Sequence, residues 1–475
     1  MSVHDDLTRE IRADTAGRRI AAFFDVDRTL WAGFSALVFF RERLFSGRMA
    51  PRELADSLAG AAGFALGRTG FSGFLTATTA GYRGMSEASL EEIGREIFEH
   101  QLATEIYPES RAILRAHQAA GHTVAIVSAA TRYQVDALAE NLGVEHVLCT
   151  KLEVRDGVIT GRVVRPTCYG EGKAVAARAF ALEHDVDLER SYFYSDSGDD
   201  LPLLDAVGKP RPLNPDRALG RAAARRSWPV RHFRSRGTPG AAELVRTGLI
   251  YGSLVPAAFA GLSTGILNGS RREAINVFGS MWADLALSLG GVGLRVEGEE
   301  HLWSQRPAVF IFNHQSAIDL PLMLKLVRRD FTGVSKQEIR RNPIFGPLFR
   351  LDGVAFVDRG ATAKAIRALE PAINALREGV SLVIAPEGTR MPTPKLGSFK
   401  KGAFHIAMQA GVPIVPVVFR NALDALPKNA LTVRPATIEA VVLPPVATRD
   451  WTRENMDAGI EAIRQRYLHV LGGNR

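Results

Sequence analysis

Short apolar runs, each followed by a polar turn, recur along the N-terminal half of the chain. Ile20–Phe24 and Thr123–Val127 are too short for helices and favour buried strands. A helix expected at Glu109–Ala120 leads through Gly121 into the second of these strands. Strand and helix continue to alternate to about Val207, which predicts a doubly wound parallel sheet.

The segment 33–105 interrupts this alternation. Its pattern is mostly helical, and Pro51 and several glycines mark breaks between short helices. Within it, residues 57–84 carry only Arg68 and Arg83 as charges. We expect a small helical cap packed over an active site. The alternative is an apolar cap that contacts a lipid tail.

The C-terminal part repeats the alternation from Leu294 onward and predicts a second α/β domain. Strands are expected near 308–312, 331–335, 353–357, 380–385 and 414–419, and helices near 318–328, 362–377 and 399–410.

A long apolar stretch lies between the two halves. The 24 residues between Arg246 and Arg271 carry no charge, and a bilayer span takes roughly 20. Pro256 interrupts this stretch, and a second apolar stretch follows at Ala274–Gly290. A single span would place the two halves on opposite sides of a membrane. We therefore expect a helical hairpin at 246–292 that lies in one membrane face, with a buried helix pair as the alternative.

At 475 residues the chain is too long for one hydrophobic core. The pattern divides it into an N-terminal domain at 15–235, with its cap at 33–105, a linker at 236–245, the hairpin at 246–292 and a C-terminal domain at 293–475.

The charge of the chain is unevenly distributed. Residues 1–235 hold 30 Lys and Arg against 31 Asp and Glu, whereas 236–475 hold 29 against 20. A basic C-terminal half suits an anionic partner, such as a phospholipid surface, a phosphate-bearing substrate or a nucleotide thioester. The sequence has no zinc-ligand cluster and no RNA-binding signature, so nucleic acid is not expected.

The cysteines and the N-terminus indicate a cytosolic protein. Cys149 and Cys168 are the only cysteines, and two isolated thiols in a chain of this size favour the reduced state. Residues 1–19 are charged and lack an apolar core, so we expect no signal peptide.

Two aspartates directly follow the first expected strand. Asp25, at the carboxyl end of a strand, can attack phosphorus and form an aspartyl-phosphate. Asp27 can protonate the leaving oxygen and later activate water. Alone, this D-x-D-x-T pattern, which ends at Thr29, is weak, because Asp after a strand also caps helices.

Three later segments complete a phosphate site in chain order. Ser128 ends the second strand, Lys173 stands just before a helix, and Asp196 and Asp200 follow a third apolar run. A hydroxyl and an ammonium can hold phosphate oxygens, and carboxylates are the ligands that Mg²⁺ prefers.

These motifs resemble the haloacid dehalogenase superfamily, particularly its phosphoserine-phosphatase-like branch with a short helical cap, over about residues 15–235. The resemblance implies Asp25 as nucleophile and Asp27 as acid and base. Arg28 stands where many members have Gly, which bears on the choice of substrate.

The same resemblance implies the ligands of the phosphate and of the metal. Phosphate is expected near Thr29, Ser128 and Lys173, and Mg²⁺ on Asp25, the carbonyl of Asp27, Asp196 and Asp200.

A second chemical signature follows the apolar run Ala308–Phe312. His314 needs a carboxylate to fix its tautomer if its other nitrogen is to take a proton from an alcohol. Asp319 is five residues away, and on a regular helix this spacing would separate the two side chains. The pair therefore requires a bend, with His314 in the loop and Asp319 in the first helical turn.

Other segments add cations and a tight turn. In Glu387–Arg390 (EGTR), Gly388 allows the turn that lets Arg390 bind phosphate through two bonds. Lys336 begins a KQEI segment, Arg359 ends an apolar run, and residues 412–416 form a VPIVP segment.

This series resembles the glycerolipid acyltransferases, specifically the 1-acylglycerol-3-phosphate acyltransferase group, over about residues 245–470. The resemblance implies an acyl-CoA or acyl-carrier-protein donor, a lysophospholipid acceptor and no metal. It implies His314 as general base and Asp319 as its orienting partner. The residues implied in substrate binding are Lys336, Arg359, Glu387, Gly388, Thr389 and Arg390.

Members of this group carry a membrane-embedded helix pair before the His motif, which favours membrane contact through 247–290 at the cytoplasmic face. The sequence thus predicts a bifunctional lipid enzyme that acylates a lysophospholipid and hydrolyses a phosphate monoester. Two alternatives remain open: another lysophospholipid or glycolipid as acceptor, and an N-terminal domain that is catalytically silent and binds lipid phosphate or organises the enzyme.

Overall fold

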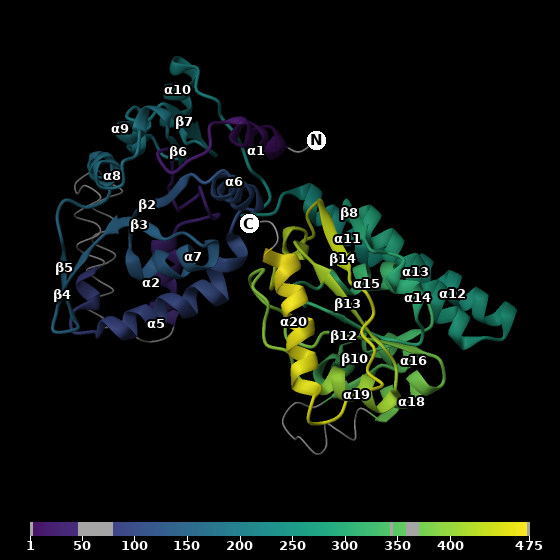
Figure 1. Cartoon of the computed structure of the whole chain (residues 1–475). Helices are drawn as coiled ribbons and strands as arrows, with labels where there is room; N and C mark the ends of the chain where they lie inside the picture. Colours follow the sequence, from purple (N-terminus) through teal and green to yellow (C-terminus); the bar gives the residue numbers. More distant parts are fainter. Residues whose placement is uncertain (1–2, 46–78, 343–344, 358–369, 473–475) are drawn as a thin grey trace. The chain divides into compact units, whose positions relative to one another are not determined.

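The computed structural model of the chain describes residues 3–45, 79–342, 345–357 and 370–472. The chain divides into two compact units, Met1–Thr238 and Pro239–Asn474 (Figure 1). Each unit is an α/β structure built on its own sheet, so the predicted fold class is confirmed.

The N-terminal unit contains a five-stranded parallel sheet in the order β3-β2-β1-β6-β7. These strands are β1 (Ala21–Phe24), β2 (Thr123–Thr131), β3 (His146–Thr150), β6 (Tyr192–Ser195) and β7 (Lys209–Pro212). The strand β2 extends to Thr131, so Ser128 lies within it rather than at its end. The register of β2 against β3 shifts between Ser128 and Thr131. An antiparallel hairpin of β4 (Leu152–Arg155) and β5 (Val158–Val163) was not anticipated.

Helices cover both faces of this sheet. One face holds α1 (Val3–Ala13), α6 (Pro108–Ala119) and α7 (Arg132–Leu142), and the other holds α8 (Glu171–Glu183), α9 (Leu201–Leu204) and α10 (Arg217–Arg226). The described parts of the cap are α2 (Ser35–Phe45), η1 (Ala80–Tyr82), α5 (Glu87–Ile97), η2 (Phe98–Leu102) and η3 (Ala103–Glu105). The predicted cap residues 46–78 lie outside the described residues.

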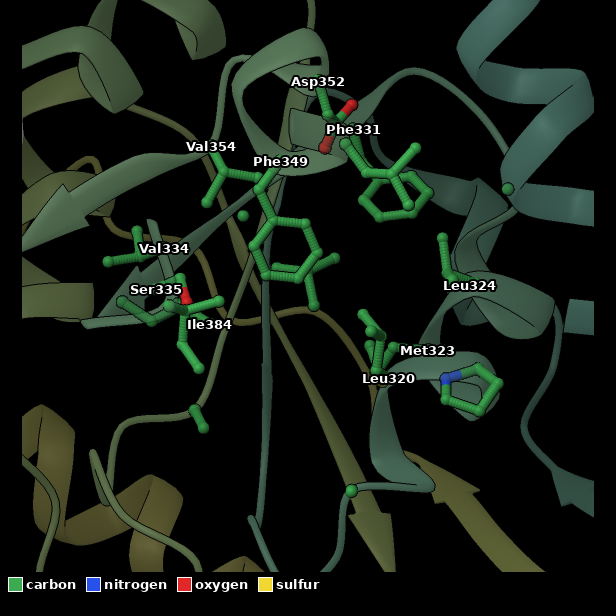
Figure 2. Close-up of a pocket in the computed structure, with 18 of the residues that line it drawn as sticks. Leu320, Met323, Leu324, Phe331, Val334, Ser335, Phe349, Asp352, Val354 and Ile384 are labelled. Atoms are coloured by element: carbon green, nitrogen blue, oxygen red, sulfur yellow. The ribbon is translucent and has the colours of Figure 1, made fainter. Parts of the chain in front are cut away.

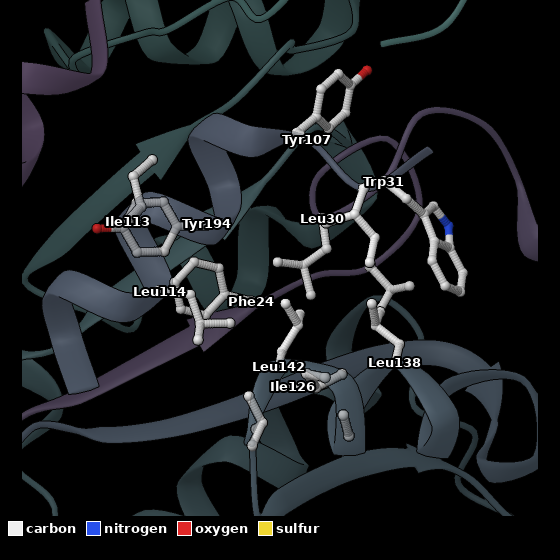
Figure 3. Packing of buried hydrophobic residues seen from close by; sticks show 14 of the residues in the cluster. Phe24, Leu30, Trp31, Tyr107, Ile113, Leu114, Ile126, Leu138, Leu142 and Tyr194 are labelled. Atoms are coloured by element: carbon white, nitrogen blue, oxygen red, sulfur yellow. The ribbon is translucent and has the colours of Figure 1, made fainter. Parts of the chain in front are cut away.

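The central strand β1 is buried on both faces. Phe24 stacks on Tyr194 of β6 with ring centroids 4.6 Å apart, within the cluster shown in Figure 3. Phe23 points to the opposite face and packs edge-on against Phe180 of α8. Packing on both faces fixes the strand end from which Asp25 follows.

The C-terminal unit contains a seven-stranded sheet in the order β11-β10-β12-β9-β13-β14-β8, in which only the β13–β14 pair is antiparallel. Its strands are β8 (Val292–Glu297), β9 (Val309–Phe312), β10 (Phe331–Lys336), β11 (Ala355–Val357), β12 (Ser381–Ile384), β13 (Ile414–Phe419) and β14 (Ala436–Val442).

Two helical layers enclose this sheet. One layer includes α13 (Arg271–Gly290) and α15 (Asp319–Val327), and the other includes α18 (Glu370–Arg377), α19 (Gly402–Ala410) and α20 (Met456–Gly472). Shorter elements are α14 (His301–Ser304), α16 (Phe345–Asp352), η6 (Gln337–Arg341) and η7 (Ala422–Asp424), with η4 (Leu188–Arg190) and η5 (Gly198–Asp200) in the other unit. Of the helix expected at 362–377, the part before residue 370 lies outside the described residues.

The apolar stretch between the halves forms helices α11 (Ala241–Gly252) and α12 (Leu254–Asn268), and α12 packs against α13 (Figure 1). Residues 241–245 were expected in the linker but form the first turns of α11. By length and composition, Ala241–Asn268 is the one helical stretch among the described residues that could cross a membrane. Glycine allows the close packing, since a β-carbon at Gly261 would lie 2.6 Å from the Ala274 carbonyl oxygen.

Candidate active sites

The first site lies at the carboxyl ends of β1, β2 and β6, where the central strands of the N-terminal sheet meet. The Lys173 ammonium donates hydrogen bonds to Asp25 Oδ1 and to Asp200 Oδ2, each 2.8 Å long. All three side chains are buried. Lys173 therefore joins two strand ends that are far apart in the sequence.

Burial and mutual repulsion dominate the electrostatics of this site. Burial raises the pKa of Asp25, and the charge of Asp200 adds to this, although Lys173 opposes both. Burial likewise raises the pKa of Asp196 to about 8, and the charge of Asp25 adds to it. One buried ammonium cannot neutralise three carboxylates, so the site favours an additional cation.

Asp27 is oriented by the residues that follow it. Its Oδ1 accepts hydrogen bonds of 2.8 Å from the Trp31 indole and from the Ser35 backbone amide, and its Oδ2 accepts one from the Ser35 hydroxyl. Burial raises the pKa of Asp27, and these hydrogen bonds oppose the shift. Asp27 is thus a fixed carboxyl group that holds a proton more readily than a free aspartate.

The two predicted hydroxyls, of Thr29 and Ser128, are both buried. Thr29 is fully buried, and its Oγ1 has no hydrogen-bond partner. Ser128 is 2% exposed, and its hydroxyl accepts a bond from the Ala130 amide. A buried hydroxyl without a partner is costly, and a phosphate oxygen would satisfy Thr29.

The oxygen-rich donor set fits Mg²⁺ chemically. However, no three acidic, His or Cys side chains among the described residues converge closely enough to hold an ion in this conformation. Asp196 instead pairs with Arg28, whose guanidinium lies 3.2 Å from Asp196 Oδ2. Arg28 has a left-handed backbone, with φ of 57°, at the position where Gly is common in the resembled family.

The second site lies at the carboxyl end of β9, where the chain bends as the His–Asp spacing requires. His314 is in the loop and Asp319 begins α15, with His314 Nδ1 2.8 Å from Asp319 Oδ2. The same oxygen accepts bonds from the backbone amides of Gln315 and Ser316, so Asp319 accepts and Nδ1–H donates. His314 Nε2 is therefore left able to accept a proton.

Glu387, which was predicted among the substrate-binding residues, lies beside the His314 loop. It is 4% exposed, and its two oxygens accept 2.7 Å bonds from the backbone amides of His314 and Gly397. Met391 donates a backbone bond to the His314 carbonyl. These contacts join the EGTR loop to the His314 loop, and both carboxylate oxygens of Glu387 are occupied by backbone amides.

The remaining predicted residues of this site are only partly described. Gly388 has φ of 72°, and Gly388, Thr389 and Arg390 line the same cavity as His314. Lys336 ends β10, but its side chain lies outside the described part, as does the whole of Arg359.

That cavity has a volume of about 1690 Å³. Figure 2 shows its apolar part, formed by side chains from α15, β10, α16 and β12, including Leu320, Met323, Phe331, Phe349 and Ile384. The cavity is larger than a typical drug-sized pocket of roughly 300–1,000 Å³. It therefore offers a large space, apolar in part, next to the His–Asp pair.

Two family models match the chain. One, described as haloacid dehalogenase-like hydrolase, matches residues 22–205, and the other, described as acyltransferase, matches residues 293–420. The chain is 34% identical over 197 residues to a 1-acyl-sn-glycerol-3-phosphate acyltransferase of Limnanthes alba, covering 41% of this chain and 69% of that protein. It is 36% identical over 219 residues to a phosphoserine phosphatase of Mycobacterium tuberculosis, covering 45% and 71%. The chain belongs to both families.

Among solved structures, the 1-acyl-sn-glycerophosphate acyltransferase of Thermotoga maritima matches 48% of this chain and 96% of its own, at 28% identity and a TM-score of 0.42. The haloacid dehalogenase-like half contains the Asp25 site, and the acyltransferase half contains the His314 site.

Sequence reasoning missed several residues that position the catalytic groups. In the haloacid dehalogenase-like half these are Trp31 and Ser35, which bind Asp27, and Ser195, whose hydroxyl donates a 2.6 Å bond to Asp200. The Trp31 indole is four residues beyond Asp27, a local signal that could have been noticed. In the acyltransferase half, the Glu387–Gly397 contact has no comparable signal.

Proposed function

We propose that this chain is a bifunctional, membrane-associated lipid enzyme. Residues 293–475, preceded by a hairpin at 246–292, transfer an acyl group from acyl-CoA or acyl-carrier protein to a lysophospholipid, most simply 1-acylglycerol-3-phosphate. Residues 15–235, including the cap, hydrolyse a phosphate monoester with Mg²⁺. The observation that carries the first activity is the 2.8 Å His314–Asp319 contact beside a large cavity that is apolar in part.

In the acyl transfer, His314 Nε2 takes the proton of the acceptor hydroxyl as its oxygen attacks the thioester carbonyl. A carbon–oxygen bond forms, the carbon–sulfur bond breaks, and the departing thiolate receives the proton. Asp319 holds the imidazole tautomer and stabilises the imidazolium that forms in between. Glu387 positions the His314 loop through the backbone amide that it binds.

The acceptor phosphate is proposed to bind Arg390, together with Lys336 and Arg359 as the family resemblance implies. Arg390 lines the cavity with His314, so a phosphate there would keep the acceptor hydroxyl near the base. Gly388 and Thr389 form the turn that carries Arg390.

In the phosphatase half, Asp25 attacks phosphorus, and the phosphorus–oxygen bond to the leaving group breaks. Asp27 protonates the leaving oxygen and then takes a proton from the water that hydrolyses the aspartyl-phosphate. Its raised pKa suits the first, proton-donating step. Lys173, Thr29 and Ser128 would hold the phosphate oxygens.

Mg²⁺ would be held by Asp25, the carbonyl of Asp27, Asp196 and Asp200, and when bound it supplies charge stabilisation for the transferred phosphoryl group. The fit rests on the buried, mutually repelling carboxylates described above. Arg28 would have to release Asp196 for that carboxylate to bind the ion.

Membrane association is proposed through the outer face of α12. Val255, Phe259, Leu262 and Ile266 follow helical spacing and are 64–74% exposed, and the last two also line the cavity. Only 22% of the most apolar window of this helical stretch is buried, which favours a lipid-facing surface over a buried helix pair. We place this surface on the cytoplasmic membrane face, where both substrates would be available.

Two assays on the purified protein test the proposal. Lipid mass spectrometry with a panel of lysolipids and acyl donors should show phosphatidic acid formed from 1-acylglycerol-3-phosphate. If only another lysolipid or a glycolipid is acylated, the proposed acceptor is wrong. Phosphate release from p-nitrophenyl phosphate should require Mg²⁺, and no release at any Mg²⁺ concentration would favour the silent-module alternative.

A further inference from the structure

The wall of the acyltransferase cavity changes character around His314. The part formed by α15, β10 and α16 is mainly apolar, and Ser335 and Asp352 are the polar side chains labelled in it in Figure 2. The part at α19 also has Ala403 and Ile406 in its lining but carries a polar row, because Lys401, just before the helix, His405 and Gln409 line it at intervals of four residues. This spacing places the three residues on one face of the helix, over about 12 Å at 1.5 Å per residue.

Two more cations border this polar wall. Lys400 precedes α19, and its ammonium lies beside the Gly388 turn, 3.4 Å from where a β-carbon on Gly388 would be. Arg453 reaches the same cavity from the segment before α20. Lys401 is paired with Asp457, so Lys400 and Arg453 carry most of the positive charge here.

Two of the cations, Arg453 and Lys401, act on His405 electrostatically. Burial lowers the pKa of His405, and the charges of Arg453 and Lys401 lower it further, whereas Asp457 acts in the opposite direction. Among the described residues that line the whole cavity, seven are Lys or Arg and the only acid is Asp352. Asp352 lies beside β10, so the α19 wall has no acid of its own within the cavity lining.

We propose that the α19 wall binds the phosphopantetheine arm of the acyl donor, with the arm's phosphate held by Lys400 and Arg453. This inference rests on the proposed acyl transfer. Coenzyme A and acyl-carrier protein present the same arm, whose amides can bond to the His405 and Gln409 side chains. The arm would then direct its thioester toward His314, and the acyl chain would continue into the apolar part.

This assignment also separates the two substrates. The acceptor phosphate is proposed to bind Arg390 on the EGTR turn, and the donor phosphate binds beyond that turn, on the α19 wall. The Lys400-Lys401 pair could instead face an anionic lipid surface, which the experiment treats as a competing outcome.

The test compares donors with and without the arm phosphate. The variant Lys400→Glu/Arg453→Glu is assayed with palmitoyl-CoA, palmitoyl-carrier protein and S-palmitoyl-N-acetylcysteamine, which has no phosphate. We expect KM to rise at least tenfold for the first two donors and to change less than twofold for the third. Arg466→Glu, an exposed charge on α20 outside the cavity, is the matched control and should change none of them.

Other outcomes overturn the assignment. Equal effects on all three donors would show general damage to the site, and an effect with palmitoyl-CoA alone would place the contact on the nucleotide rather than on the arm. Reduced liposome binding with unchanged KM values would assign the two cations to the membrane. If the unmodified protein transfers no acyl group from any donor, the proposed function itself fails, which is a different result.

Discussion

The two candidate active sites differ in how many charged groups they bury and in the space beside those groups. Around Asp25, three carboxylates and one ammonium are buried together, and the pKa values of Asp25 and Asp196 are raised. Around His314, one His–Asp pair, fixed by backbone amides, borders a large cavity. The first site is a compact cluster of buried charged groups. The second consists of the His314–Asp319 pair and a large adjoining cavity.

This contrast indicates what each site requires in addition to its own side chains. The Asp25 site has more buried carboxylates than buried cations, and a bound cation would offset that excess negative charge. The His314 site has a pre-oriented base, and its reaction depends on how the cavity holds two substrates in register. Mutations in the first site should therefore act mainly through charge, whereas in the second site the packing of the cavity wall should matter as well.

The largest effect should come from removing each reacting group in turn. We expect His314→Ala to lower acyl transfer at least about 10⁴-fold without changing phosphate release, and Asp25→Asn to do the reverse. Both activities are measured on the same preparations, by lipid mass spectrometry and by p-nitrophenyl phosphate hydrolysis. Loss of both activities in either folded variant would contradict two independent sites.

The sequence predicted the parts of this contrast that depend on local patterns. Asp25, Asp27 and His314 come within three residues of the end of an apolar strand. Their position at the carboxyl ends of the parallel strands therefore follows from the order of strands and loops in the sequence. The bend between His314 and Asp319 also followed from spacing, since a regular helix would separate them. Both α/β folds were predicted from the alternation of strands and helices.

What the sequence could not predict depends on distant contacts. The parallel pairing of β8 with β14 joins Val292–Glu297 to Ala436–Val442, and no periodicity encodes that partner. The bond from Glu387 to the Gly397 amide, and the Arg28–Asp196 pair, arise only when loops meet in space. Such contacts carry no local sequence signal, because any of several acidic or basic residues could have formed them.

The charge of the first site can be tested through stability. Lys173→Met would leave Asp25 and Asp200 buried without their ammonium, which should lower the free energy of unfolding by about 3–5 kcal/mol. Lys209→Met is the matched control, since Lys209 pairs with Asp14 nearer the surface, and should cost no more than about 1 kcal/mol. Urea unfolding of the full chain measures both, and equal losses would show that Lys173 does not offset the buried carboxylates.

Among the described residues that line the cavity of the second site, the only acid is Asp352, and its pKa is raised by burial as those of Asp25 and Asp196 are. Burial raises its pKa to about 7, although Arg271 and Arg272 oppose the shift. The folded protein therefore keeps the Asp352 proton between about pH 4 and 7 while the unfolded chain loses it, so the contribution of Asp352 to stability falls as pH rises across this range.

Asp352→Asn should remove that dependence. At pH 8 the variant should be more stable than the unmodified protein, by at most about 4 kcal/mol for a shift of this size, and at pH 4 the two should match. Exposed Asp450→Asn serves as the control and should change stability little at either pH. A constant difference across pH 4–8 would mean that Asp352 does not titrate in this range.

The smallest effect concerns the shape of the second site, through the packing of α12 on α13. At Gly261, which also lines the cavity, an added β-carbon would lie 2.6 Å from the Ala274 carbonyl oxygen and 2.9 Å from Phe278 Cβ. Gly261→Ala should therefore cost about 1–3 kcal/mol by overpacking. At Gly248 in α11 nothing lies within 4 Å, so Gly248→Ala should stabilise the helix by up to about 1 kcal/mol.

The same Gly→Ala change is thus expected to lower the stability of the protein at residue 261 and to raise it at residue 248. Melting of the purified protein in detergent measures both, with acyl transfer and phosphate release as parallel readouts. Gly261→Ala should lower acyl transfer and leave phosphate release unchanged, since it alters only the wall of the second site. If both variants stabilise the protein, α12 does not pack against α13 as described, and the shape of the acyltransferase cavity does not depend on this hairpin.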